Sequence, residues 1–156
     1  MLREGKVIGC SLNVDLLQYL SMPQMPSQLD LFRKIGEAGR HLEGQLNLSS
    51  FKAGEVCYGM MGCVDPKEAG KQAATLFWLH QVTLGKLAGW KYFFSRISSP
   101  VSLRLLQKMG GEVIAETEIA GLEGEQKMWM VKIDLRKPDC SPSQMRQCSV
   151  PPGPKL

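Results

Sequence analysis

Segments typical of strands alternate with segments typical of helices along most of this chain, and their order limits the folds open to it. Apolar or β-branched runs predict strands at 6–15, 54–64, 90–97, 112–120 and 126–135. Apolar residues at helical spacing predict helices at 28–42, 70–88 and 99–109. A helix follows each of the first three strands, and the last two strands are consecutive. The sequence therefore predicts an α/β or α+β domain, with helices on a mixed sheet that ends in an antiparallel hairpin.

Several of these segments also carry a prediction about which side is buried. Strand 54–64 is nearly uncharged and ends at Asp65-Pro66, which is typical of a strand buried on both faces. In strand 126–135, the residues Trp129, Val131, Ile133 and Leu135 alternate with Met130, Lys132 and Asp134, which predicts one buried face. The apolar stripe of helix 70–88 consists of Ala73, Leu76, Phe77, His80, Leu84 and Leu87. His80 is therefore expected to be a neutral histidine of the core.

One folded domain is predicted for residues 1–136. A chain of 156 residues can bury a core without the help of a metal or of disulfides. Residues 137–156 contain five of the nine prolines, so this tail is predicted to be disordered. A partner-docking role for the tail would rest on Pro151-Pro152-Gly153-Pro154, a segment without aromatic anchors that is more typical of a solvated end.

Charge and hydropathy exclude some classes of function. The formal net charge is +4, with no run of cations outside the tail, so a nucleic-acid surface is not expected, while one phosphate-bearing ligand stays open. The apolar runs are shorter than the roughly 18 residues that cross a bilayer, and the N-terminus lacks the core of a secretory signal. We therefore expect a cytoplasmic protein that does not bind a membrane.

The cysteines give no sign of a metal centre. Their number, five, is odd, and no CxxC pair occurs, so neither a zinc site nor a disulfide framework is predicted. We expect Cys10, Cys57 and Cys63 to be buried, reduced thiols.

The junction from Val64 to Ala74 is the strongest local signal for a binding site. A strand predicted to be buried gives way there to a helix, through the turn that follows Asp65-Pro66. The first N–H groups of a helix lack intrahelical acceptors and lie at the positive end of the helix dipole, so they can hold a phosphate. Many such junctions bind no ligand, so this pattern alone is weak.

The junction, together with motifs further along the chain, resembles a known protein family. Val64-Asp65-Pro66, the turn Ala69-Gly70-Lys71-Gln72-Ala73-Ala74 and the later Ser99-x-x-Ser102-x-x-Leu105-x-x-Lys108-x-Gly110 are similar to motifs of the GCN5-related N-acetyltransferase superfamily. Helix 28–42, ahead of the junction, looks most like the animal arylalkylamine-type branch. The resemblance covers roughly residues 5–135. It implies a mostly antiparallel mixed sheet with helices on both faces, and a chain that begins near the third strand of the family.

The resemblance implies acetyl-CoA as cosubstrate, in a cleft where strand 54–64 splays from strand 90–97. Pantetheine would pair with the backbone of residues 61–64, and the pyrophosphate would rest on N–H groups of residues 70–75. The cofactor-binding residues expected on this basis are Cys63, Val64, Gly70, Lys71, Gln72, Ala73, Ala74, Thr75, Ser99 and Ser102. The acceptor would be a small amine, in a pocket shaped by loops 18–27 and 121–124.

Three departures from the family pattern concern binding and catalysis. Ala69 stands where the family turn has Arg or Gln, and Gln72 stands where it has Gly. A positive φ at Gln72 would cost about 1 kcal/mol or more. On the later helix, Ser99 and Gly111 replace Asn and Phe. Leu106 replaces the tyrosine that often acts as general acid, and leucine has no proton to donate.

The catalytic groups expected from the sequence are Glu55 as base and Tyr58 as acid. His80 is a second candidate base, and Tyr92, the Cys57 thiol or an ordered water are further candidate acids. For each of the two tyrosines, packing in the core of the sheet is favoured over a catalytic role. The family's base often comes from a region that precedes the first strand present in this sequence.

Two functions of different classes follow. The first is an acyl-CoA-dependent N-acyltransferase that acetylates a small amine by direct attack in a ternary complex. The second is a non-catalytic binding module with an acetyltransferase fold, which Ala69, Gln72 and Leu106 favour.

Overall fold

The computed structural model describes residues 1–23, 29–68, 72–121 and 126–137. A short hairpin, β1 (Leu2–Arg3) and β2 (Lys6–Val7), precedes a five-stranded sheet. The sheet strands are β3 (Gly9–Asp15), β4 (Val56–Val64), β5 (Tyr92–Ile97), β6 (Glu112–Glu118) and β7 (Lys127–Asp134). The helices are α1 (Leu16–Ser21), α2 (Asp30–Gly44), α3 (Ala73–Leu87) and α4 (Pro100–Lys108), with 3₁₀ turns η1 (Leu48–Ser50) and η2 (Pro66–Glu68).

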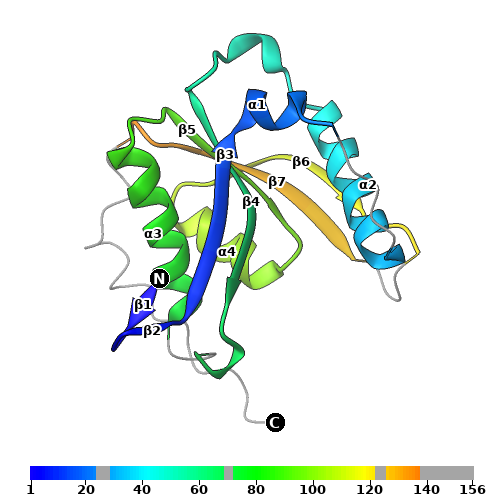
Figure 1. The fold of residues 1–156 in the computed structure, drawn as a ribbon. Coiled ribbons are helices and arrows are strands. Elements are labelled where there is room, and N and C mark those ends of the chain that lie inside the picture. Colours follow the sequence, from blue (N-terminus) through cyan, green and yellow to red (C-terminus); the bar gives the residue numbers. More distant parts are fainter. Residues whose placement is uncertain (24–28, 69–71, 122–125, 138–156) are drawn as a thin grey trace.

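The sheet is mixed and its strand order is β3-β4-β5-β7-β6. Only β4 and β5 run parallel, while the other neighbouring strands are antiparallel. Helices α1 and α2 pack on one face of the sheet, and α3 and α4 pack on the other (Figure 1). The predicted order of elements, the mostly antiparallel sheet and the helices on both faces are therefore confirmed. The predicted tail lies, apart from Lys137, outside the described residues.

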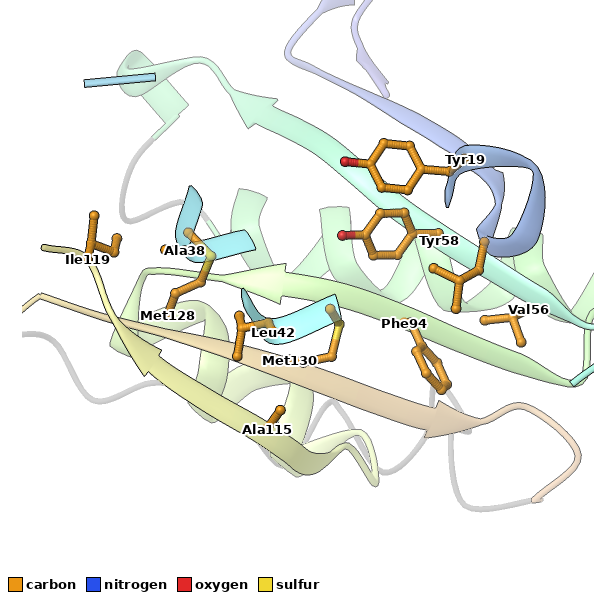
Figure 2. Close-up of a cluster of buried hydrophobic side chains, with 11 residues drawn as sticks. Tyr19, Ala38, Leu42, Val56, Tyr58, Phe94, Ala115, Ile119, Met128 and Met130 are labelled. Carbon is orange, nitrogen blue, oxygen red and sulfur yellow. The ribbon is translucent and has the colours of Figure 1, made fainter. Parts of the chain in front are cut away.

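Each face of the sheet has its own apolar core. Under α1 and α2, Leu42 packs with strand residues such as Tyr58, Phe94 and Met130 (Figure 2). Under α3 and α4, Phe93, Val131 and Ile133 pack with helix residues such as Leu106. Strand β7 supplies buried side chains to both cores because it is an inner strand, so the prediction of a single buried face for 126–135 is wrong.

Strands β4 and β5 pair only over part of their length. Their parallel register runs from Val56 opposite Tyr92 to Gly59 opposite Ser95. At the last pair, the Ser95 hydroxyl donates to the Gly59 carbonyl at 3.1 Å. Beyond this fork β4 continues against β3 alone, and residues 61–63 are exposed. The prediction that this strand is buried on both faces is therefore correct for residues 56–59 and wrong for the end of the strand.

Two helices differ from the sequence-based expectations. Residues 16–21 form α1, although no helix was predicted there and residues 18–21 were expected to belong to a loop; its N-cap Asp15 accepts a hydrogen bond from the Gln18 N–H at 2.9 Å. In α3 the buried residues are Ala73, Phe77, Gln81, Val82 and Gly85, whereas His80 is exposed. Because α3 is apolar on most of its surface, spacing alone does not define its buried side.

Candidate functional site

A cleft of about 200 Å³ opens where β4 and β5 separate. It lies on the α3 side of the sheet, and Phe77, Trp78 and Gln81 of α3 line it. Residues of β3, β4, β5 and the start of α4 complete the lining: Ser11, Asn13, residues 59–62, Phe93, residues 95–99 and Ser102. The splay expected between these two strands is therefore present, and it exposes backbone of β4 that no strand covers on the β5 side.

Two amide side chains stand at the inner wall of the cleft. Asn13 Nδ2 donates to Gln81 Oε1 at 2.6 Å, and Gln81 is only 3% exposed. Asn13 Oδ1 is buried and has no hydrogen-bond partner among the described residues. A buried acceptor without a donor is costly, so this oxygen is suited to receive a hydrogen bond from a bound molecule.

The turn before α3 combines a left-handed residue with a helix start. Gln72 is the N-cap of α3 and has φ +61°, so the family's glycine position does take the conformation that glycine favours. Ala73, Ala74 and Thr75 form the first turn, whose N–H groups have no acceptor within the helix. Ala73 is one helical turn before the cleft residue Phe77, so this turn lies beside the cleft. Gly70 and Lys71 lie outside the described residues.

Two of the remaining expected cofactor residues line the cleft, and two do not. Ser99 is the N-cap of α4, and its hydroxyl oxygen accepts a hydrogen bond from the Ser102 N–H at 3.4 Å. Both serines line the cleft. Cys63 and Val64 lie at the end of β4, where Cys63 is exposed and Val64 is half-buried.

Neither expected catalytic residue lines the cleft. Glu55 precedes β4, about 13 Å along the strand from Gly59. Lys91 Nζ donates to its Oε1 at 2.5 Å, and this hydrogen bond, with one from the Lys52 N–H, lowers the pKa of the Glu55 carboxyl. A carboxylate stabilised in this way is a poor proton acceptor.

Tyr58 belongs to the core on the other face of the sheet. It is fully buried, and its hydroxyl donates to Glu43 Oε1 at 2.7 Å. Burial raises the pKa of the Tyr58 phenol far above its usual value. Tyr58 is therefore a neutral hydrogen-bond donor that holds Glu43.

A buried charge pair was not expected from the sequence. Arg96 Nη1 lies 3.4 Å from Glu43 Oε1, and the guanidinium stands over the rings of Tyr58 and Tyr19 at 5.7 and 5.9 Å from their centroids. Helix α2 approaches this arginine at Gly39, where an added Cβ would lie 1.9 Å from Arg96 Nη1. A glycine inside an amphipathic helix was the available signal for this close approach.

The other candidate acids and bases are also away from the cleft. His80 is exposed, which corrects its expected place in the core. The Tyr92 hydroxyl accepts a hydrogen bond from Arg136 Nη2 at 2.7 Å, at the opposite end of β5. Cys57 is buried as expected, and burial and then the charge of Asp15 raise the pKa of its thiol to about 11. Cys10 and Cys63 are exposed, so the expectation that they are buried is wrong.

Comparison with known proteins finds no match by sequence but several solved structures with a similar fold. No protein-family model matches the sequence, and no curated protein matches it. Solved structures do resemble it: the C-terminal condensation domain of Ebony in complex with beta-alanyl-dopamine has 14% identity and a TM-score of 0.68, over 83% of this chain and 67% of that one. Arylalkylamine N-acetyltransferase 2 from Aedes aegypti has 15% identity and a TM-score of 0.67, over 86% and 71%.

A third solved structure, the polyamine N-acetyltransferase of Drosophila melanogaster, has 13% identity and a TM-score of 0.62, over 85% of this chain and 72% of that one. The chain thus has the fold of the GCN5-related N-acetyltransferases, and arylalkylamine N-acetyltransferases are among the structures that share it. Within the part of the chain that the structure describes, no helix is long and apolar enough to span a membrane.

Proposed function

We propose that this chain is an acyl-CoA-dependent N-acyltransferase that transfers an acetyl group to a small amine. The observation that carries the proposal is the forked cleft between β4 and β5, with a helix start and a left-handed Gln72 beside it. Similar structures named as arylalkylamine, agmatine and polyamine N-acetyltransferases support an amine as the acceptor.

The residues of the cleft fit acetyl-CoA as a substrate. Exposed backbone of residues 61–64 would pair with the amide groups of pantetheine, as a neighbouring strand would. The N–H groups of Ala73, Ala74 and Thr75 would face the pyrophosphate, at the positive end of α3. Ser99 accepts a hydrogen bond from Ser102, so its own hydroxyl proton is available to a ligand atom.

Orientation is the main contribution that these residues would make to acyl transfer. The bound thioester supplies an activated acyl group, which an amine in the same cleft would attack directly. The new C–N bond would replace the C–S bond, and CoA would leave as a thiolate that takes a proton from solvent. Among the described residues that line the cleft there is no carboxylate, imidazole or thiol. Water would therefore take the proton of the amine, and the protein would hold the two reactants in contact, with Asn13 Oδ1 as a buried acceptor.

A charge placed in the first turn of α3 tests the proposal. Thr75→Asp adds an anion where the pyrophosphate would bind, yet an acidic residue stabilises the start of a helix. Thr75→Asn is the uncharged control of nearly the same shape. We expect Thr75→Asp to weaken acetyl-CoA binding about tenfold or more and Thr75→Asn to change it little, as measured by calorimetry.

Thermal unfolding provides a second measurement. Acetyl-CoA at about 100 times its dissociation constant stabilises a protein by roughly 2.7 kcal/mol, which shifts the melting temperature by several degrees. Equal affinities of the Asp and Asn variants would contradict binding at this turn. The absence of any shift at millimolar acetyl-CoA would contradict the acyltransferase proposal itself.

A binding module without catalysis is the second candidate function. The observation in its favour is the lining of the cleft, whose described residues include no group that titrates near neutral pH. Mass spectrometry of tryptamine, agmatine and spermidine incubated with the protein and acetyl-CoA separates the two. Acetylated amine above the uncatalysed level supports the enzyme, whereas acetyl-CoA binding without product supports the module.

A further inference from the structure

Cys10 and Cys63 form a pair of thiols across two strands. They are direct partners in the antiparallel register of β3 and β4, although 53 positions separate them in the chain. Their sulfur atoms lie 3.3 Å apart, and their hydrogen bond is the largest cause of the raised pKa of the Cys10 thiol. The two side chains therefore already point toward one another.

The backbone around this pair can accommodate a disulfide. The Asp65 N–H donates to the Ile8 carbonyl at 2.8 Å, and these residues lie two positions from Cys63 and Cys10 on the same ladder. Hydrogen-bonded and non-hydrogen-bonded pairs alternate along antiparallel strands, so Cys10 and Cys63 also form a hydrogen-bonded pair, with Cα atoms about 5.5 Å apart. Disulfides join Cα atoms separated by about 4.4–6.8 Å, so no strand has to move.

Solution reagents can reach the two sulfur atoms. Both cysteines are exposed, whereas Cys57 is buried. The adjacent residues Ser11 and Gly62 line the cleft, and an added Cβ on Gly62 would touch Phe77 of α3. Because successive side chains in a strand point to opposite faces, the thiols of Cys10 and Cys63 point away from the cleft and from α3.

We propose that Cys10 and Cys63 are a thiol–disulfide modification site, which a small-molecule disulfide oxidises. One thiolate of the pair attacks a sulfur of the reagent, so that a mixed disulfide forms and one reagent thiolate leaves. The second protein thiolate then attacks the protein sulfur of that mixed disulfide and releases the other reagent thiolate. The protein loses two protons and two electrons, and the reagent is reduced to two thiols. This site does not depend on the proposed acyl transfer.

Mass spectrometry after treatment with oxidised glutathione tests the proposal. The protein is the full chain with Cys140→Ser and Cys148→Ser, which leaves Cys10, Cys57 and Cys63. We expect its intact mass to fall by two hydrogen atoms and to return after dithiothreitol. Digestion with trypsin and chymotrypsin, which cuts after Tyr58, should give a peptide pair linked through Cys10 and Cys63, with Cys57 still able to be alkylated after denaturation.

Cys10→Ser and Cys63→Ser, each in the same background, are the matched controls. Neither should lose two hydrogen atoms, and the cysteine left at the site should end as a mixed disulfide with glutathione. The proposal is wrong if the parent protein stays fully reduced, stops at a mixed disulfide, or forms a link between two chains. The readout is a mass, so a protein that fails to bind acetyl-CoA can still give the expected result.

Discussion

At the scale of single residues, Gln72 has a backbone conformation that ordinarily belongs to glycine. Its φ is +61°, its side chain makes no capping hydrogen bond to α3, and it is exposed. An L-residue in the left-handed region is strained by contact between its Cβ and its own backbone. The strained backbone of Gln72 therefore destabilises the fold, and no capping hydrogen bond from its side chain compensates for this.

Gln72→Gly should relieve that strain. We expect the free energy of unfolding to rise by about 1 kcal/mol, which chemical denaturation measures. Gln72→Ala is the control, because alanine keeps the Cβ and should leave the stability within about 0.5 kcal/mol of the parent. A loss of stability in the glycine variant would contradict the left-handed conformation, since glycine at an ordinary φ adds chain entropy to the unfolded state.

At the scale of secondary structure elements, the packing of α2 on the sheet depends on the lack of a side chain at Gly39. Arg96 of β5 lies under this glycine, and Glu43 and the rings of Tyr58 and Tyr19 hold its guanidinium. The arginine is only 17% exposed along its side chain. A buried charge that loses its partner is strongly destabilising. The pair of Glu43 on α2 and Arg96 on β5 therefore fixes the position of the helix over the strand.

Gly39→Ala and Gly36→Ala should have opposite effects in the same helix. At Gly39 a Cβ would lie 1.9 Å from Arg96 Nη1, and we expect a loss of about 1–3 kcal/mol. At Gly36 the nearest atom would be Arg40 Nη1 at 3.7 Å, an ordinary contact. There we expect a gain of about 0.5–1 kcal/mol, because alanine favours the helix. Similar changes in unfolding free energy for both variants would contradict the packing of α2 over Arg96.

At the scale of the whole molecule, two buried acids connect global stability to pH. Burial raises the pKa of the Cys57 thiol from 9.0 to about 11 and raises that of the Tyr58 phenol further. Each group binds its proton more tightly in the folded state than in the unfolded state. Their stabilising contribution is therefore complete below about pH 9 and is lost as the pH rises above it.

Urea unfolding under reducing conditions should show this loss. We expect the free energy of unfolding to fall by up to about 2 kcal/mol between pH 9 and pH 11 through Cys57, with a further fall through Tyr58 above about pH 10. Cys57→Ala should make the fall that begins at pH 9 smaller, although the variant is less stable at every pH. A pH dependence identical to that of the parent would show that Cys57 does not titrate on unfolding.

The two helix starts beside the cleft could be predicted from the sequence. The turn before α3 and the positions of Ser99 and Ser102 follow from local spacing, because a helix start is encoded by a few consecutive residues. Glu55 and Tyr58 are expected as catalytic groups because they lie on strand 54–64, which borders the predicted cleft. Alternation along a strand does not say how far the paired part extends, and the fork at Gly59 leaves both residues outside the cleft.

The sequence alone was enough to predict the five main strands, the helices α2, α3 and α4, and the strand-to-helix junction that resembles the acetyltransferases, since these depend on spacing within one segment. Tertiary structure alone decided the buried side of α3, the contact of Arg96 with Glu43, and the pairing of Cys10 with Cys63. Each of these depends on sheet register or on the contact of segments far apart in the chain, and local pattern carries no information about either.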